Sequence, residues 1–334
     1  MPPRPSPQPD SLISAIRHAN RVFHVTLSPM TGQLPPRIAL RFAAVLAVLL
    51  CGALVAPNAS ADPSDTGRER AMGYYLALGD SLAAGYQPGV GDERAGGYVG
   101  DVLKHIQATS PKTRLVNVSC SGETTVTLMQ GGRCTYAEGS QLAAAKAFLK
   151  SHGQFTRVVT IDIGANDITR CAAGGALDQG CFMQQAALVH TNLRAILAVL
   201  RKGAPHAKIV VLNYYNPFLA AWLTGPAGQV LAQTTTGGLQ AFNAGLAAAA
   251  TSVNGVTADV SAAFSSTDWT MVPVSATTTM PLNVLRICQW TWMCTKSDIH
   301  VNDTGYTVLA TAVNNALDSA RLGLPRAHRE IHHR

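Results

Sequence analysis

The chain contains 334 residues, enough for one large domain or two small ones, and carries a formal net charge of +7 at pH 7. Much of this charge belongs to the N-terminal part, because residues 62–334 contain 21 Lys and Arg against 18 Asp and Glu, a net charge of +3. This weak charge, with no basic stripe and no aromatic platform in the sequence, argues against a nucleic-acid partner.

The first 61 residues have the pattern of a leader rather than of a domain. Residues 1–36 contain eight prolines, and the basic segment Arg37–Arg41 precedes an apolar run, Phe42–Ala56, and the small residues Ala59–Ala61. A basic region, an apolar run and a small-residue site are typical of a cleaved secretory signal. The run is shorter than the ~20 apolar residues of a membrane span, so we expect cleavage near Ala61 and no membrane span in the mature protein.

The position of this signal suggests where the leader and the domain divide. Met30 would give the signal a short basic start, so we interpret residues 1–29 as an N-terminal extension and about 30–61 as the signal peptide. Cys51 lies inside the apolar run, and the residue before it is Leu50. A lipoprotein signal would have a small residue there, so lipidation is not expected. The remaining chain, residues 62–334, is expected to be secreted or associated with the cell wall.

The cysteines are consistent with export. Beyond the apolar run the sequence contains six of them, Cys120, Cys134, Cys171, Cys181, Cys288 and Cys294. An even number of cysteines in an exported chain suggests disulfides, although six allow 15 pairings. They form three close pairs along the sequence, and no C-x-x-C spacing indicates a metal site. We therefore expect the disulfides 120–134, 171–181 and 288–294 and no bound metal.

In chain order, apolar runs alternate with segments of helical periodicity. Strands are predicted at residues 74–78, 114–118, 157–163, 208–212 and 255–259, and helices at residues 98–109, 141–150, 182–202, 228–251 and 304–322. Such alternation indicates a parallel five-stranded sheet with helices on both faces. The regular spacing without a composition break indicates one domain over residues 62–334. About forty residues before His300 read as a loop, and a loop of that length hints at function.

Polar residues follow the ends of several predicted strands. Ser81 follows the first strand, Gly122 the second and Asn166 the third, whereas His300 follows the long loop. The carboxyl ends of parallel strands share one edge of a sheet, where ligands bind. Acyl transfer requires a nucleophile, a base and hydrogen-bond donors for an oxyanion. We expect Ser81 as the nucleophile and His300 as the base. The N–H groups of Ser81 and Gly122, with the Asn166 amide, would form the oxyanion hole.

These residues resemble the four sequence blocks of the SGNH (GDSL) hydrolase family. The matching segments are Gly79–Leu82, Gly122, Gly164–Asp167 and Asp298–Tyr306. The resemblance implies a three-layer α/β/α sandwich of flavodoxin-like architecture with a five-stranded, mainly parallel sheet. It also implies ester hydrolysis through a covalent acyl-enzyme, without a metal or other cofactor. The three close cysteine pairs and the segment Gln289–Cys294 resemble those of secreted actinobacterial members.

One position departs from the family pattern. The family usually has an Asp three residues before the His, where this chain has Ser297, and Asp298 stands two residues before His300. Asp298 can orient the imidazole if the backbone is extended, because side chains at i and i+2 then share a face. Otherwise a backbone carbonyl near Ser297 or Asp298 must accept from the ring. The sequence leaves both possibilities open.

The function that these observations favour is a secreted serine esterase or lipase that acts on a small-molecule or lipid ester and that we expect to be a monomer. An alternative on the same scaffold is a carbohydrate or peptidoglycan O-acetylesterase. A third is a non-catalytic, wall-associated binding protein, which would have no reason to retain the full set of Ser81, Gly122, Asn166 and His300. Trp290 and Trp292 precede His300 and either line an acyl pocket or pack their loop onto the body.

Overall fold

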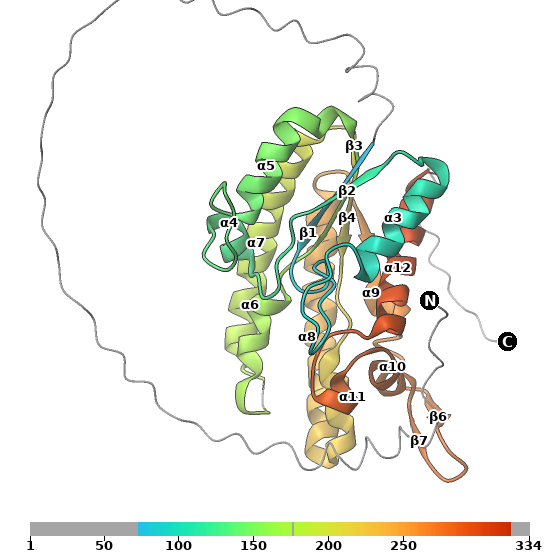
Figure 1. The fold of residues 1–334 in the computed structure, drawn as a ribbon. Helices are drawn as coiled ribbons and strands as arrows, with labels where there is room; N and C mark the ends of the chain where they lie inside the picture. The colour runs from blue at the N-terminus through green and yellow to red at the C-terminus, as the bar shows by residue number, and fades with distance from the viewer. Residues whose placement is uncertain (1–72, 176, 322–334) are drawn as a thin grey trace, which may run out of the picture.

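The structure, a computed structural model, describes residues 73–175 and 177–321 (Figure 1). The expected N-terminal extension, signal peptide and cleavage site lie outside these residues. None of the helices in the described part of the chain has both the length and the apolar character that a bilayer crossing requires.

A parallel sheet in the order β2-β1-β3-β4-β5 forms the centre of the molecule. Its strands are β1 (Tyr74–Gly79), β2 (Arg114–Asn117), β3 (Thr156–Asp162), β4 (Lys208–Leu212) and β5 (Val256–Ala258). In this register Leu76 of β1 lies opposite Val159 of β3, and Ile161 of β3 lies opposite Val211 of β4. The predicted five-stranded parallel sheet is confirmed.

Two helical layers cover this sheet, so that the fold is a three-layer α/β/α sandwich (Figure 1). One face is covered by α3 (Gly97–Thr109) and α12 (Asp303–Arg321). The opposite face is covered by α5 (Gln141–His152), α7 (Gln179–Gly203) and α8 (Pro226–Thr251). Polar side chains cap the N-termini of two of these helices. Ser140 accepts a backbone N–H from the first turn of α5, and Asp178 accepts one from the first turn of α7.

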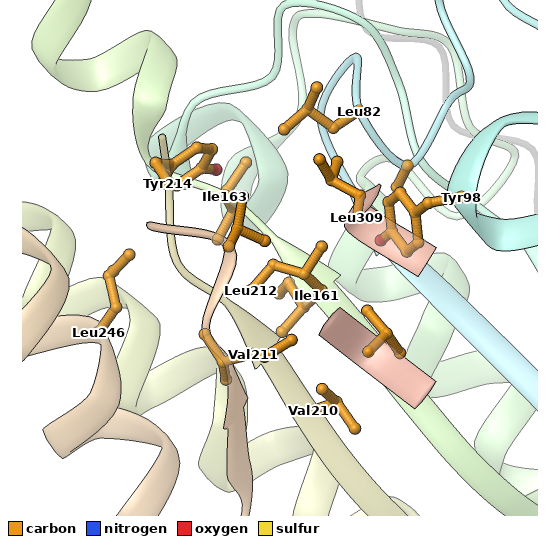
Figure 2. Close-up of a cluster of buried hydrophobic side chains, with 14 of the residues drawn as sticks. Leu82, Tyr98, Ile161, Ile163, Val210, Val211, Leu212, Tyr214, Leu246 and Leu309 are labelled. Carbon is orange, nitrogen blue, oxygen red and sulfur yellow. The ribbon is translucent and has the colours of Figure 1, made fainter. Parts of the chain in front are cut away.

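The core lies on both faces of the central strands (Figure 2). Leu246 of α8 lies on one side of these strands, whereas Tyr98 of α3 and Leu309 of α12 lie on the other. The strands themselves contribute Ile161, Val210, Val211 and Leu212. Burial of one such side chain stabilises the fold by about 1.5–3 kcal/mol. Because both faces are covered, the central strands are nearly continuous apolar runs rather than alternating ones.

The segment that the sequence predicted as a forty-residue loop before His300 is partly ordered into elements, and that prediction was wrong. It contains α9 (Val260–Ala263), the antiparallel hairpin of β6 (Met271–Pro273) and β7 (Thr279–Pro281), α10 (Leu282–Trp290) and α11 (Met293–Lys296). These elements are short, so their apolar periodicity is too brief to be detected in the sequence. Other short elements were missed for the same reason: α4 (Thr125–Gln130), α6 (Ala165–Thr169), η1 (Gly153–Phe155), η2 (Arg170–Gly175) and η3 (Pro217–Thr224).

Three disulfides join cysteines that are close in sequence. The structure pairs Cys120 with Cys134, Cys171 with Cys181 and Cys288 with Cys294, which is the pairing expected from the sequence. Each one closes a local segment at or beside the carboxyl edge of the sheet: the turn after β2, the start of α7, and the segment before His300. The sheet itself contains no disulfide.

Candidate active site

The end of β1 requires a glycine. Gly79 has φ +141, and a Cβ at this position would lie 2.4 Å from the backbone oxygen of Asp162 on β3. Only glycine tolerates both the backbone conformation and this close approach. The next residue, Asp80, donates its N–H to the same Asp162 oxygen at 3.0 Å. This tight turn places Ser81 at the carboxyl edge of the sheet.

Ser81, His300 and Asp298 form a continuous chain of hydrogen bonds. The Ser81 Oγ lies 2.8 Å from His300 Nε2, and His300 Nδ1 lies 2.6 Å from Asp298 Oδ1. An ionised carboxylate only accepts hydrogen bonds, so Nδ1 carries the proton and donates it to Asp298. In the neutral imidazole Nε2 is then the acceptor of the Ser81 hydroxyl. This is the arrangement in which a histidine can remove the proton of a serine.

Asp298, rather than a backbone carbonyl, contacts the ring nitrogen of His300. The same Asp298 oxygen also accepts the backbone N–H of His300 at 2.9 Å. The residue before it, Ser297, is exposed and has φ +52, so the chain turns there after α11. Of the two possibilities that the sequence left open, the structure contains the carboxylate contact.

Three groups are candidate oxyanion donors: the N–H groups of Ser81 and Gly122 and the side-chain amide of Asn166. Within the described residues, the N–H groups of Ser81 and Gly122 donate to no protein acceptor. Asn166, at the start of α6, uses one amide hydrogen to donate to the backbone oxygen of Glu123 at 2.8 Å, which leaves its second hydrogen free. Backbone and amide donors that are fixed before substrate binds can stabilise charge as it develops. Asn166 lines the same cavity as Ser81, and its bond to Glu123 places it next to the turn of Gly122.

The side chain of Arg133 packs against the turn that carries Gly122. Gly122 has φ +81, and a Cβ there would lie 2.5 Å from the guanidinium group of Arg133. Arg133 Nε donates to the backbone oxygen of Ser121 at 3.0 Å. The Arg133 side chain therefore occupies the space that any larger residue at position 122 would need.

A second brace joins α6 to α4. Asp167, which follows Asn166, accepts the N–H of Thr125 at 2.9 Å and the hydroxyl of Thr125 at 2.8 Å. Burial raises the pKa of Asp167 above its usual value. The two bonds tie the segment after β3 to the segment after β2, so the Asn166 amide and the Gly122 N–H are held relative to one another.

Glu123 is a buried acid beside the oxyanion donors that the sequence did not single out. Its side chain is fully buried, and one oxygen accepts the hydroxyl of Thr127. The other oxygen has no hydrogen-bond partner in the described part of the chain. Burial raises the pKa of Glu123, because an apolar surrounding disfavours the charged form. No sequence pattern marks this residue, since a Glu in a turn is ordinarily exposed.

Two more buried acids, Asp80 and Asp162, lie close to Ser81. Asp80 accepts the N–H of Leu82 at 3.1 Å and the hydroxyl of Tyr214 at 3.3 Å, whereas Asp162 accepts the hydroxyl of Tyr98 at 2.5 Å. Burial raises the pKa of both carboxyls, and the charge of Asp80 raises that of Asp162 further. Two carboxylates close together in an apolar environment favour retention of a proton on the pair. The bond from Leu82 shows that the Asp80 carboxyl stabilises the turn after β1.

A cavity opens from Ser81 and His300 into the helical layer of α7 and α8. Its empty volume is about 760 Å³, including open space at the mouth. Its wall is mainly apolar, with side chains from α6, α7, η3 and α8, among them Ile168, Phe182, Phe218 and Leu239. The sequence did not identify these residues as cavity lining, because an apolar side chain facing a cavity has the same helical spacing as one in the core.

The two tryptophans before His300 do not line this cavity. Trp290 packs edge-to-face on Phe264, with the ring centroids 5.1 Å apart. Trp292 donates its indole N–H to Gln87 at 2.7 Å. Of the two roles left open by the sequence, packing of the loop onto the body is the one found. The sequence did not single out Gln87, because a lone glutamine in a loop belongs to no motif.

Comparisons with known proteins place the chain among hydrolases. The model of the GDSL-like Lipase/Acylhydrolase family matches residues 77–308. A search of curated proteins finds no match.

Several solved structures are similar to the chain. A lipase from a goat rumen metagenome is 19% identical with a TM-score of 0.49, and the alignment covers 73% of this chain and 97% of that one. A phospholipase A1 from Streptomyces albidoflavus is 20% identical with a TM-score of 0.47, with 73% and 99% covered. A catalytic mutant of an acetylxylan esterase from Geobacillus stearothermophilus is 19% identical with a TM-score of 0.45, with 76% and 95% covered.

The family match spans every part of the site. It begins in β1, before Ser81, and extends into α12, beyond His300. It includes the donors Gly122 and Asn166 between them. Because the matched residues make up more than half of the sequence, the chain belongs to the GDSL-like Lipase/Acylhydrolase family.

Proposed function

We propose that this protein is a serine esterase or lipase that hydrolyses carboxylic esters through a covalent acyl-enzyme. The observation that carries the proposal is the chain of hydrogen bonds from Ser81 through His300 to Asp298, at the mouth of an apolar cavity. Membership of the hydrolase family supports the same chemistry. In this proposal the three residues are catalytic.

The reaction follows from the positions of the atoms. The Ser81 Oγ attacks the ester carbonyl carbon while its proton passes to His300 Nε2. The carbonyl oxygen becomes an oxyanion and accepts hydrogen bonds from the N–H groups of Ser81 and Gly122 and from the Asn166 amide. When the tetrahedral intermediate collapses, His300 gives its proton to the departing alcohol, and the acyl group remains on Ser81. Water then attacks the acyl-enzyme with His300 as base, which releases the acid and restores Ser81.

The cavity favours an ester with a long apolar acyl chain over an acetate. Polar side chains in its wall are already bonded within the protein: Asn216 donates to Thr235 at 3.0 Å, and Tyr215 donates to the backbone oxygen of Ile299 at 2.6 Å. No charged residue or histidine occurs between Lys208 and Asp259, the segment that contributes η3 and α8. Such a wall gains free energy by covering hydrocarbon and offers little to a sugar hydroxyl.

The test is hydrolysis of nitrophenyl esters from acetate to palmitate by the purified protein and by its Ser81→Ala variant. We expect activity that rises with chain length beyond acetate and that falls at least ~10³-fold in the variant. Ser110→Ala, at the far end of α3, is the matched control and is expected to retain full activity.

Two results would count against the proposal. Activity that survives in Ser81→Ala would exclude the serine mechanism. Activity on acetate alone would instead favour the O-acetylesterase alternative, with acetylated glycans as the next substrates. No activity on any ester, glycan acetates included, would favour a binding protein.

We further infer that the protein is exported as a single domain, residues 62–334, after cleavage near Ala61. Three disulfides within the described residues support an oxidising compartment, because cytosolic thiols are kept reduced. The N-terminal sequence of protein recovered from the culture medium tests this inference. A first residue far upstream of Ala61 would contradict it.

A further inference from the structure

The side chain of Gln87 lies between the segment of Ser81 and the segment of His300. Its Oε1 accepts the indole N–H of Trp292 at 2.7 Å, and its Nε2 donates to the backbone oxygen of Val301 at 3.2 Å. An indole N–H only donates and a carbonyl oxygen only accepts, so the chemistry of the partners determines the orientation of the amide. One amide thus joins the loop after β1 to residues on both sides of His300 in the chain.

The loop that presents Gln87 is itself tightly folded. The N–H of Tyr86 donates to the backbone oxygen of Ser81 at 3.0 Å, and Gln87 and Gly91 exchange backbone hydrogen bonds at 3.0 and 2.9 Å. The ring of Tyr86 packs against the imidazole of His300, with the centroids 4.4 Å apart. The hydroxyl of Tyr306 donates to the backbone oxygen of Tyr86 at 2.9 Å. Ser81 and Gln87 are therefore parts of one braced turn.

The partners of Gln87 are equally well connected to His300. The N–H of Trp292 donates to the backbone oxygen of His300 at 2.9 Å, and Thr291 forms an antiparallel bridge with Val301. Val301 is fully buried. Residues 291–292 and 300–301 thus run side by side. The Gln87 amide bonds to Trp292 in the first segment and to Val301 in the second.

We propose that Gln87 is a positioning residue, which holds the imidazole of His300 at the distance where Nε2 accepts the Ser81 hydroxyl. This inference rests on the proposed function, in which His300 is the general base. A base must lie within about 2.6–3.2 Å of the proton that it removes. A displacement of about 1 Å can cost ~10²-fold in rate. The two bonds of Gln87 act on the His300 segment and contact neither the substrate nor the reacting atoms.

The test removes both bonds in one variant and the Trp292 bond alone in another. Gln87→Met preserves the approximate length of the side chain and removes both bonds, whereas Trp292→Phe preserves an aromatic ring and removes only the indole donor. Gln107→Met is the matched control, because Gln107 on α3 donates to the backbone oxygen of Thr113 at 2.9 Å, away from the site. Each variant is assayed for kcat, for KM and for the rate at which a fluorophosphonate reacts with Ser81, a reaction that needs the same base.

We expect Gln87→Met to lower kcat and the fluorophosphonate rate in parallel, by about 10- to 100-fold, with KM within about twofold of the parent. Trp292→Phe should lower both by a smaller factor. In the double variant the two losses should not multiply, because both changes remove the same contact. The Gln107→Met control should match the parent protein.

Two outcomes would overturn the inference. One is a Gln87→Met protein whose kcat and fluorophosphonate rate equal those of the control, even if its melting temperature is lower. The other, which applies also if Gln87→Met does not fold, is a folded Trp292→Phe protein with unchanged rates. Ser81→Ala separates these results from a failure of the proposed function: activity that persists without Ser81 refutes the serine mechanism itself, whereas activity that depends on Ser81 but not on Gln87 refutes only the positioning role.

Discussion

In the proposed mechanism His300 acts as a base only if its ring is held in the correct tautomer, and Asp298 is the group in contact with the ring nitrogen. The carboxylate contacts both the Nδ1 and the backbone N–H of His300. Both Asp298 and His300 are partly exposed, with side-chain exposures of 24% and 19%. In the proposed mechanism this contact would therefore orient the ring and stabilise the imidazolium, rather than act as a deeply buried ion pair.

We predict that Asp298→Ala lowers kcat by about 10²–10⁴-fold, because the ring loses its orienting acceptor. The measurement is steady-state hydrolysis of a nitrophenyl ester. Asp303→Ala, an exposed carboxylate at the start of α12, is the control and should leave kcat unchanged within about twofold. A loss of less than tenfold in Asp298→Ala would mean that a backbone carbonyl takes over the orienting role.

Glu123 illustrates a different residue-scale effect, on stability. Its pKa is raised in the folded protein, so between the ordinary pKa of Glu, about 4.3, and the higher folded value the native state binds more protons than the unfolded state. The free energy of unfolding must then fall as pH rises through this interval. The unfolding free energy falls most steeply between the two pKa values, and the loss is complete above the folded pKa.

We predict that Glu123→Gln removes this part of the pH dependence. The variant should gain stability relative to the parent protein as pH rises above about 4.3, by at most ~1.4 kcal/mol per pH unit for one proton. Urea denaturation between pH 4 and pH 8 measures the difference. Glu138→Gln, an exposed acid in the same part of the chain, should show no such trend. Parallel stability curves for Glu123→Gln and the parent would contradict the prediction.

Among the elements, α7 and α8 form the wall of the cavity as well as part of the core. Phe182, near the start of α7, lines the cavity and lies over Gly238 of α8, where an added Cβ would be in ordinary contact with its ring at 3.4 Å. Leu239 lines the cavity one residue further along. The opposite side of α8 is exposed at Val230, which offers a site on the same helix that does not face the cavity.

We predict that Leu239→Trp shortens the preferred acyl chain. The larger side chain fills part of the cavity, so kcat/KM for palmitate esters should fall about tenfold or more relative to kcat/KM for acetate esters. The ratio of the two is measured with nitrophenyl esters. Val230→Trp is the matched control and should leave the ratio unchanged. An unchanged ratio in Leu239→Trp would show that the acyl chain binds elsewhere.

At the scale of the whole molecule, one hydrophobic core connects the sheet with the helices on both faces. The core includes residues from β1, β3, β4 and β5 and from α3, α5, α7, α8 and α12. The candidate active site is built on this core from four segments that are far apart in sequence. Since they share one sheet edge, loss of the core should abolish all parts of the site together.

We predict a single cooperative unfolding transition for the oxidised protein. Far-UV and near-UV circular dichroism should report the same melting temperature, and the calorimetric and van't Hoff enthalpies should agree. Ile161→Ala, in the centre of β3, should lower the melting temperature equally in both spectral regions and destabilise the protein by about 2–5 kcal/mol. Two separate transitions would contradict the single domain inferred for residues 62–334.

The strands, the long helices and the disulfide pairs of this protein can be predicted from its sequence, for identifiable physical reasons. Strands buried on both faces are uninterrupted apolar runs, and long helices repeat their apolar residues often enough to be detected, so all five strands and the five long helices were found. Gly79, Ser81 and His300 lie where strands or loops end beside the sheet edge, which parallel topology makes predictable. Cysteines close in sequence needed only a short segment to pair.

What required the tertiary structure are contacts between segments distant in sequence. The Asp298 carboxylate could be chosen over a carbonyl only once the turn at Ser297 was known. Burial of Glu123, the cavity beside Phe182, and the bonds of Gln87 to Trp292 and Val301 depend on packing that leaves no periodic signal. A sequence determines which residues can meet at a sheet edge, but side-chain orientation and burial arise from the packed chain as a whole.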